Sequence, residues 1–500
     1  MFTVTFKLNT NKQQVKIFNK RFFIYNKLKN TEIKYAQKLI KLLERDKTYL
    51  NTRKEYVHFK HDLPDNKINR KRLSELFNVM SQRRKIYCLT NFDLKMFIKP
   101  MRKKYAKFIS SQQGQSISEE VWKAVEKYLF EDGKSIHLKK INETLSIPQT
   151  TNLNGVKLNK DEASIEWLGI TVPVKVRHSK YVEECMDKNF KYCYINREMF
   201  NSGWKYYVTL IFEGDPPLRY PSSHEYTLGL DPGTSTFAMV KDNKVILDNL
   251  ASKAVEYAKQ VRHLDRLIEH SLRINNPDNY NKDGTNKKKT KKFKSVWNIS
   301  NRCKILKRKR KTIFRKQAAY VLQSHRQQLN EVLKDVNSVI SEEMNFKALQ
   351  KRTKKTEKSD KTIITKSGKE VTKYKKKKRF GKSLSLHAPA SFVSELKRKC
   401  KLLNIEYHEV NTYVYKASQF DHTSGEYIKY SLKDRTKIID GHMVQRDLYS
   451  AFLIKNANPD LASVNIDKCN KEFPTFLKHQ EQCLNFMKAN HINNKACFGF

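Results

Sequence analysis

A short strand-turn-strand pattern around one aspartate constrains the fold of this chain more than any other stretch. Residues 226–230 form an apolar run that ends on Asp231, and a Pro-Gly turn leads to a second apolar run from Phe237. A polar turn at 241–244 then precedes a third run at 245–247. Short apolar runs bounded by proline and glycine favour strands over helices. The pattern predicts a three-stranded meander with Asp231 on its first strand, where a carboxylate is either a rigid metal ligand or a cap of its own turn.

The charge of the chain indicates a polyanionic partner. Among 500 residues, 100 are lysine or arginine and 51 are aspartate or glutamate, which gives a formal net charge of +49. Such a surplus destabilises a compact fold by self-repulsion unless a polyanion neutralises it, and nucleic acid is the obvious one. The length predicts about two to four domains. The apolar residues, 39% of the chain, are enough for sizeable cores.

The cysteine pattern and the lack of export signals predict a cytoplasmic protein. The eight cysteines are scattered, and no two of them have the Cys-x-x-Cys spacing of a zinc ribbon or a thioredoxin-type motif. Isolated cysteines are typical of a reducing compartment. The N-terminus lacks a basic region followed by an apolar core, and no uncharged apolar run approaches the length of a membrane span. We therefore expect no membrane partner.

The first 225 residues predict a β-domain with a helical block inserted into it. Residues 2–8 alternate as in a strand, and a helical pattern follows them. From about residue 30 to 140, apolar side chains recur at three- and four-residue spacing with hardly any glycine or proline, which favours charged helices. Residues 146–225 then contain strand-like runs between short polar turns, typical of a small barrel or sandwich. The first strand is expected to join that sheet.

The region after the meander predicts long basic helices. Residues 251–272 are amphipathic, and a second helical segment runs from about 302 to 333. Basic residues there bracket two aromatic side chains, which suits backbone contact plus base stacking, although charge runs are most often solvated faces. The expected nucleic-acid contacts are Lys291, Lys292, Trp297, Arg308, Arg310 and Lys311.

The last third of the chain predicts alternating strands and helices. Residues 335–343 indicate a strand that ends on acids, and residues 351–379 indicate a basic loop of low apolar content. The remaining expected elements are helices at 388–403, 446–454 and about 476–489 and a strand at 407–410.

Three acids lie on or at the ends of these predicted elements. Asp231 lies on the first strand of the meander, Glu342 at the end of a later strand, and Asp447 in the first turn of a late helix. Carboxylate and water oxygens are the ligands that Mg²⁺ prefers. Two divalent cations about 4 Å apart can activate a water and neutralise charge at phosphorus during phosphodiester hydrolysis. The three acids therefore predict a site for two Mg²⁺ ions, or Mn²⁺, as in ribonuclease H-like nucleases.

Short motifs around these acids resemble those of the TnpB family, transposon-encoded RNA-guided nucleases ancestral to the compact type V CRISPR effectors. Leu-Gly-Leu-Asp-Pro-Gly-Thr at 228–234 is similar to the family's first RuvC motif, Gly-Ile-Asp-x-Gly. Ser-Glu-Glu-Met-Asn-Phe-Lys at 341–347 is similar to the second, Glu-Asp-Leu-Asn, and selects Glu342 over Glu343. Gln-Arg-Asp-Leu-Tyr-Ser-Ala-Phe-Leu-Ile at 445–454 matches the third, Asp-Arg-Asp-x-Asn-Ala-Ala. Each motif alone is weak evidence for the resemblance, whereas the three motifs in the family's order are strong evidence.

The resemblance implies an α+β multidomain protein with a ribonuclease H-like (RuvC) α/β nuclease domain, a wedge β-barrel and a helical recognition lobe. The implied domains are the wedge barrel (1–30 and 145–225), the recognition lobe (31–144), the nuclease domain (226–416, with a helical insertion at 251–333), a degenerate zinc-ribbon-like insertion (417–445), and the last nuclease helix with the tail (446–500). Asp231, Glu342 and Asp447 would be the catalytic Mg²⁺ ligands.

The resemblance also implies the partners. A guide RNA, from a transposon end or a CRISPR array, would pair with double-stranded target DNA next to a short flanking motif. The protein would work in a prokaryotic cytoplasm, associated with the nucleoid when bound. Two alternatives stay open: a guide-RNA-dependent DNA-binding regulator that does not cut, and a protein-only recombinase or resolvase on the same fold. The three acids argue against the first, and the helical insertion with its separate barrel argues against the second.

One departure from the family concerns zinc. The family carries two Cys-x-x-Cys pairs before its third motif, and the aligned positions here are Asp421, Ser424, Lys437 and Asp440. A charged lysine cannot ligate zinc, so we expect no zinc and a small insertion held by other groups. Those groups are the apolar Phe420, Tyr427, Ile428, Tyr430, Ile438 and Ile439, and ion pairs of Lys437 with Asp421 and Asp440. Two histidines, His422 and His442, are more often surface or hydrogen-bonding residues than ligands.

Overall fold

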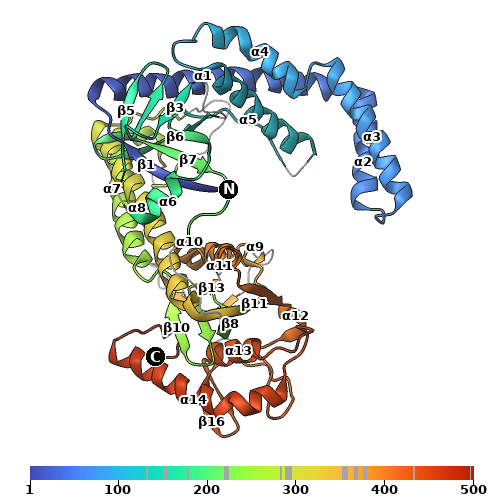
Figure 1. Cartoon of the computed structure of the whole chain (residues 1–500), viewed down its shortest axis with the longest axis vertical. Coiled ribbons are helices and arrows are strands. Elements are labelled where there is room, and N and C mark those ends of the chain that lie inside the picture. Colours follow the sequence, from blue (N-terminus) through green and yellow to red (C-terminus); the bar gives the residue numbers. More distant parts are fainter. Residues whose placement is uncertain are drawn as a thin grey trace. The chain divides into compact units, whose positions relative to one another are not determined.

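The computed structural model of the chain describes all residues except 131–132, 150–154, 177–178, 219–224, 282–283, 288–294, 352–357, 365–369, 375–379, 432–433 and 496. The chain divides into two units, Met1–Pro217 and Leu218–Phe500 (Figure 1). Each unit has a sheet and hydrophobic cores of its own. The division lies a few residues before the boundary at 225 and 226 that the sequence predicts.

The N-terminal unit is built on a seven-stranded antiparallel sheet with the order β2-β6-β7-β1-β5-β4-β3. Its strands are β1 (Phe2–Leu8), β2 (Ser146–Gln149), β3 (Val156–Asn159), β4 (Ser164–Trp167), β5 (Thr171–Lys175), β6 (Phe190–Phe200) and β7 (Gly203–Phe212). β1 lies between β7 and β5, so the first strand joins the sheet formed by later residues, as predicted. Within the described residues β2 and β3 are the edges, so the sheet is open and not a closed barrel.

Helices occupy most of the chain between β1 and β2. The helices of this unit are α1 (Lys12–Leu43), α2 (Lys47–His61), α3 (Lys67–Ile86), α4 (Asn91–Lys103), α5 (Ser111–Phe130) and α6 (Lys180–Met186), with a 3-10 turn at Ile141–Glu143. Asn11 and Gln14 form a capping box that fixes the start of α1. Phe18 of α1 packs edge-on against Trp167 of the sheet, with ring centres 4.7 Å apart. Because α1 continues to Leu43, the boundary predicted at 30 and 31 lies inside one helix.

The C-terminal unit contains a five-stranded mixed sheet with the order β10-β9-β8-β11-β14. Its strands are β8 (Tyr226–Pro232), β9 (Thr236–Val240), β10 (Val245–Asn249), β11 (Val336–Glu342) and β14 (Glu406–Val410). β8, β9 and β10 form the predicted antiparallel meander, and β11 and β14 add to β8 in parallel. A meander followed by two parallel strands is the ribonuclease H-like α/β sheet that the sequence predicts.

Helices cover both faces of this sheet. The helices of the unit are α7 (Ala254–Asn275), α8 (Asn301–Val332), α9 (Phe346–Leu349), α10 (Gly381–His387), α11 (Pro389–Leu403), α12 (Thr412–Tyr415), α13 (Arg446–Lys455) and α14 (Ile466–Ala489), with 3-10 turns at Pro277–Asn279 and Leu333–Asp335. On one face α13 and α14 share a core with Ala238, Val240 and Ile340. On the other, α8 and α11 share a core with Leu228 and Leu230.

Two predictions about local structure were wrong. The expected loop at 351–379 contains an antiparallel ribbon of β12 (Lys358–Ile364) and β13 (Glu370–Tyr374), whose few apolar residues gave little strand signal. The last helix, α14, begins at Ile466 and not near 476, because it includes Pro474, a residue that ordinarily breaks a helical pattern. Among the described residues, no helix combines the length and the apolar character needed to cross a bilayer.

Candidate active site

β8 directs Asp231 toward helix α13. Side chains alternate between the two faces of a strand, so Gly229 and Asp231 share one face, while Leu228 and Leu230 enter the core beneath α8 and α11. The backbone of α13 passes so close that a Cβ on Gly229 would lie 2.2 Å from the carbonyl oxygen of Ala451. Glycine at this position therefore lets α13 approach β8 beside Asp231.

The neighbouring strand β11 brings Glu342 to the same end of the sheet. β11 runs parallel to β8 with Ser341 opposite Leu230, so Glu342 and Asp231 are the next residues at the carboxyl ends of the two strands. The two carboxyl groups lie close enough for each to affect the pKa of the other. The adjacent Glu343 is exposed. The geometry thus brings Glu342, and not Glu343, to Asp231.

The first turn of α13 supplies the third acid. Gln445 caps the helix by accepting a hydrogen bond from the backbone N–H of Leu448 (2.8 Å). Asp447 lies in the turn that follows, where the partial positive charge of a helix N-terminus stabilises a carboxylate. Its side chain is 21% exposed, and its charge acts on both Asp231 and Glu342. The three acids that the sequence singles out are therefore electrostatic neighbours.

The electrostatics of the site are those of carboxyl groups crowded together. Burial raises the pKa of Asp231 well above its usual range, and the charges of Glu342 and Asp447 raise it further. Burial also raises the pKa of Glu342, while the neighbouring Thr412 and Asp231 side chains act to lower it. Both shifts favour the protonated form, so the pair holds on to a proton more readily than isolated carboxyl groups do.

Two arginines that sequence reasoning missed flank Asp447. The Nε and Nη2 atoms of Arg446 each lie 3.1 Å from Oδ1 of Asp447. Nη1 of Arg435 lies 3.7 Å from the other oxygen, Oδ2. The signal for Arg446 was available, because it stands inside the third motif at 445–454. Nothing in the local sequence around Arg435 indicates its proximity.

The carboxylates fit a hard divalent cation in chemistry but are not arranged around one. Among the described residues, no three His, Cys, Asp or Glu side chains are grouped so that they could hold a metal ion as they stand. Two N–H groups of Arg446 instead occupy Oδ1 of Asp447. Three neighbouring carboxyl groups with a retained proton are short of positive charge, which is the condition that Mg²⁺ or Mn²⁺ would relieve.

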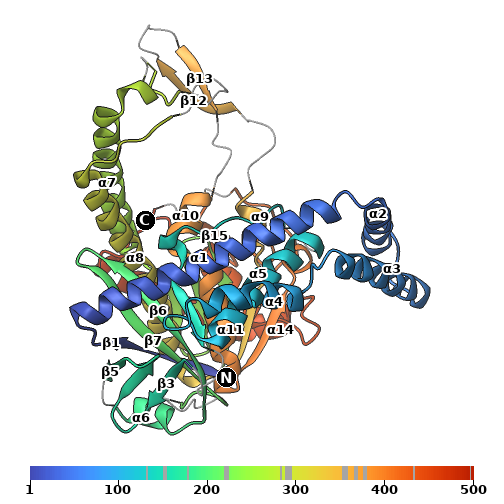
Figure 2. The same cartoon turned by 90° about the horizontal axis from the view of Figure 1, so that it is seen from above.

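Four of the six predicted nucleic-acid contacts lie on or just before α8, which runs side by side with α7 (Figure 2). Arg308 and Lys311 are exposed on α8, and Trp297 is 39% exposed just before it. Arg310 is held by an ion pair with Asp265 of α7 (2.6 Å), so its charge is partly used within the protein. The other two predicted contacts, Lys291 and Lys292, lie outside the described residues.

The insertion at 417–445 is built around a buried lysine. Its strands are β15 (Thr436–Ile439) and β16 (His442–Gln445), which pair antiparallel. The Lys437 side chain is 3% exposed, and its ammonium donates to the carbonyl oxygen of Ser418. The ammonium lies 4.6 Å from the ring centre of Tyr430 and 5.6 Å from that of Tyr449. Burial lowers the pKa of Lys437 to about 8.

The packing of this insertion differs in part from the prediction. Within the described residues Lys437 forms no ion pair with Asp421 or Asp440, because its ammonium is turned to the carbonyl and the rings. Phe420 and Ile439 are buried, whereas the apolar side chains of Tyr427, Ile428 and Ile438 are 52%, 40% and 71% exposed. His422 is buried, and its Nδ1 lies 2.7 Å from the hydroxyl of Tyr449.

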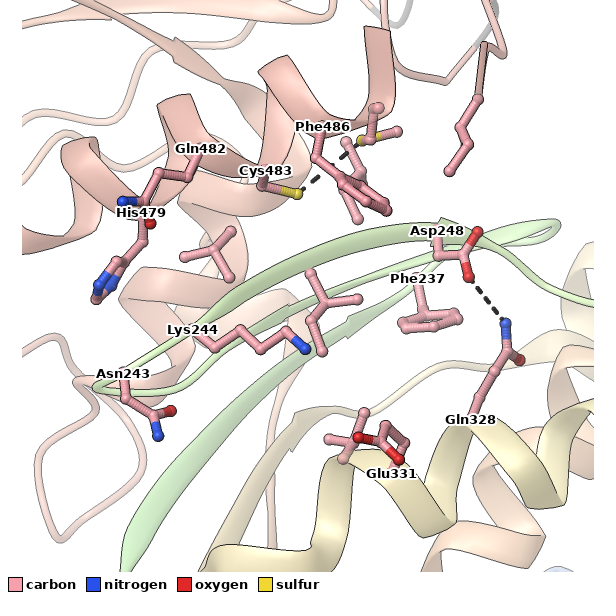
Figure 3. Close-up of a pocket in the computed structure, with 16 residues that line it drawn as sticks. Phe237, Asn243, Lys244, Asp248, Gln328, Glu331, His479, Gln482, Cys483 and Phe486 are labelled. Atoms are coloured by element: carbon pink, nitrogen blue, oxygen red, sulfur yellow. Dashed lines mark hydrogen bonds between the residues drawn. The ribbon is translucent and has the colours of Figure 1, made fainter. Parts of the chain in front are cut away.

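A cavity of about 500 Å³ lies elsewhere in this unit, between β10, α8 and α14 (Figure 3). Its apolar lining includes Phe237, Leu247 and Phe486. Asp248 lies at one side, where its Oδ2 accepts a hydrogen bond from Nε2 of Gln328 (3.2 Å) and burial raises its pKa. None of the three acids lines this cavity, which the sequence did not indicate.

Comparison with known proteins adds structural similarities alone. Neither a protein-family model nor a curated protein matches the sequence. The chain is similar to a cryo-EM structure of a Cas12f1–sgRNA–target DNA complex, with 11% identity, 92% of this chain and 99% of that chain covered, and a TM-score of 0.43. It is also similar to a cryo-EM structure of a CRISPR–Cas12f ternary complex, with 12% identity, coverage of 89% and 82%, and a TM-score of 0.30. The fold class assigned above depends on the strand order of the sheet and not on these similarities.

Proposed function

We propose that this protein is an RNA-guided DNA endonuclease of the TnpB and compact type V type, which cleaves DNA by phosphodiester hydrolysis at Asp231, Glu342 and Asp447. The observation that carries the proposal is the convergence of these acids from β8, β11 and α13 at one end of a ribonuclease H-like sheet. They belong to three motifs in the order that the family uses.

The roles of the acids follow from their placement. Asp231 and Glu342 sit on adjacent parallel strands, so their separation is fixed by the sheet, and Asp447 reaches them from α13. Together they would hold two Mg²⁺ ions, or Mn²⁺. When bound, such ions supply an activated water and neutralise charge at the scissile phosphate. The insertion before α13 contributes Arg435, which with Arg446 makes the surroundings of Asp447 cationic.

The proposed partners are a guide RNA and a double-stranded DNA target next to a short flanking motif. A net charge of +49 suits a protein that holds a long RNA together with a heteroduplex. Base pairing would read the target sequence, while the protein contacts backbone and shape. Arg308 and Lys311, exposed on α8, are proposed backbone contacts, and Trp297 a stacking contact.

Cleavage by the full chain purified with its copurifying RNA tests this function. Sequencing that RNA identifies the guide, and a DNA carrying the matching target is then the substrate in Mg²⁺. We expect Asp231→Ala, Glu342→Ala and Asp447→Ala each to lower the cleavage rate by about a hundredfold or more while target binding stays near the wild-type level, because the acids serve the chemistry.

Glu343→Ala is the matched control for this experiment. Glu343 follows Glu342 in the sequence but is exposed, so its replacement should leave cleavage intact. Target binding without cleavage by the wild-type protein would support a guide-dependent regulator instead. Cleavage that requires no RNA would support a recombinase or resolvase.

A further inference from the structure

The guanidinium of Arg446 lies among the carboxylates of the candidate site. Its Nε and Nη2 both donate to Oδ1 of Asp447, at 3.1 Å each. The charge of the same guanidinium also acts on Asp231, across the site. With side-chain exposures of 11% for Arg446 and 21% for Asp447, the pair is largely withdrawn from water. A charge-assisted contact of this kind is stronger than an exposed surface pair.

The remaining edge of the guanidinium is fixed by the insertion. Nη1 of Arg446 donates to the backbone carbonyl of Asp434 (3.0 Å) and lies 3.4 Å from that of Ser431. The backbone N–H of Arg446 donates to the carbonyl of Arg435 (2.9 Å). The side chain is therefore held on two sides, by the acid that it neutralises and by the loop that precedes it.

We propose that Arg446 is a positioning residue that competes with the divalent cation for Asp447. This inference rests on the proposed function. It adds that Arg446 controls how readily the proposed site binds its metal. An oxygen that accepts two N–H donors has little remaining capacity for a metal. A fixed positive charge beside it also repels a cation. The metal can engage Oδ1 of Asp447 only after Arg446 turns away from it, and binding through Oδ2 alone would still meet the repulsion of the guanidinium.

The competition links metal binding to the insertion at 417–445. Nη1 of Arg446 donates to the backbone carbonyls of Ser431 and Asp434. Any shift of that loop therefore changes the contact between Arg446 and Asp447. In the wild-type protein Arg446 neutralises Asp447 when metal is scarce. The same contact weakens metal binding for as long as the loop keeps Arg446 in place.

Localised backbone cleavage by Fe²⁺ measures metal occupancy without using nuclease activity. Fe²⁺ takes the place of Mg²⁺ at oxygen-ligand sites, and with ascorbate and peroxide it cuts the polypeptide next to where it is bound. The full chain with its copurified RNA is titrated with Fe²⁺, and fragments ending near 231, 342 and 447 are quantified. We expect Arg446→Gln to lower the Fe²⁺ concentration for half-maximal local cutting by about tenfold, the effect of losing one charge-assisted contact.

Two further variants make the result specific. Arg446→Lys keeps the charge but has one donor nitrogen in place of the planar fork of Nε and Nη2, so it should fall between the wild type and Arg446→Gln. Arg398→Gln breaks an arginine–carboxylate pair with Glu395 on α11, away from the three acids, and should match the wild type. Equal Fe²⁺ requirements in the wild type and both Arg446 variants would overturn this inference and leave the proposed metal site standing. No local cutting in any of the proteins would instead overturn the proposed metal site, and the inference with it.

Discussion

Glu32 on α1 is a buried carboxyl group whose ionisation affects the stability of the N-terminal unit. Its Oε1 accepts a hydrogen bond from the hydroxyl of Ser118 on α5 (2.6 Å), while Oε2 has no partner among the described residues. Burial raises the pKa of Glu32 to about 7, against the effects of Ser118 and of the charge on Lys29. A carboxyl group with a raised folded-state pKa contributes stability that is complete below the unfolded value, 4.5, and is lost as the pH rises to about 7.

We expect Glu32→Gln to stabilise the protein at pH 8 by on the order of 2–3 kcal/mol, because the wild type then holds a buried charge that the amide avoids. At pH 5 the wild-type carboxyl group is protonated in the fold, so the advantage should nearly vanish. Thermal unfolding at the two pH values measures the difference. Glu126→Gln, at an exposed position of α5, should follow the wild type at both. An advantage of Glu32→Gln that is equal at pH 5 and pH 8 would contradict this account.

At the residue scale the sequence predicts which acids converge but not what surrounds them. Asp231, Glu342 and Asp447 could be found because each one ends a strand or begins a helix inside a short motif. Arg446 stands in the same motif, yet only the folded chain shows that its guanidinium neutralises Asp447. The burial of Lys437 is equally invisible, because a lysine on a short strand is expected to be exposed.

At the element scale the insertion at 417–445 shows how a small β-hairpin is held by side chains. Lys437 connects β15 to the carbonyl of Ser418 and to the rings of Tyr430 and Tyr449. Tyr449 belongs to α13 and lies two residues after Asp447, so the same cluster supports the helix that carries the third acid. His422 adds a hydrogen bond to that tyrosine.

We expect Lys437→Ala to lower the free energy of unfolding by about 2–3 kcal/mol, because it empties a packed position and leaves a carbonyl without its donor. Cleavage should fall as well, since α13 loses part of its support. A zinc-selective chelator should change neither the melting temperature nor the cleavage rate of the wild type. Elemental analysis of the chelator-washed protein provides the independent check, and stoichiometric zinc there would refute a metal-free insertion. Lys429→Ala, at an exposed position of the same insertion, is the control.

Secondary structure was predicted correctly where the apolar periodicity and the turn residues indicate the same element. The meander of β8, β9 and β10 and the helices α7, α8 and α13 carry strong apolar patterns between clear turns. The prediction failed for β12 and β13, which have few apolar residues, and at the start of α14, where Pro474 interrupts the pattern. The full length of α1 was also missed, since the helix continues without a break through residues 30 and 31 to Leu43.

At the scale of the whole molecule, the net charge of +49 is the property that most limits how the protein can exist alone. Part of that charge lies on exposed side chains of α8. α8 has 32 residues and so extends about 48 Å, with Arg308 and Lys311 three residues apart on one exposed side. A row of this kind repels itself in free protein and is neutralised along a nucleic-acid backbone. We therefore expect the purified chain to carry RNA and to aggregate when stripped of it.

The salt dependence of RNA binding tests this reading of the charge. Each phosphate that a side chain neutralises releases counterions, so the slope of log K against log salt concentration is proportional to the number of contacts. Arg308→Ala with Lys311→Ala should reduce the magnitude of that slope by about 2 and weaken binding uniformly across RNA sequences, because backbone contacts carry no sequence information. Lys471→Ala with Lys478→Ala removes the same charge from exposed positions of α14 and is the matched control. Equal slopes in the two double variants would show that α8 has no special role, and an affinity of the wild type that is insensitive to salt would contradict nucleic-acid binding driven by charge.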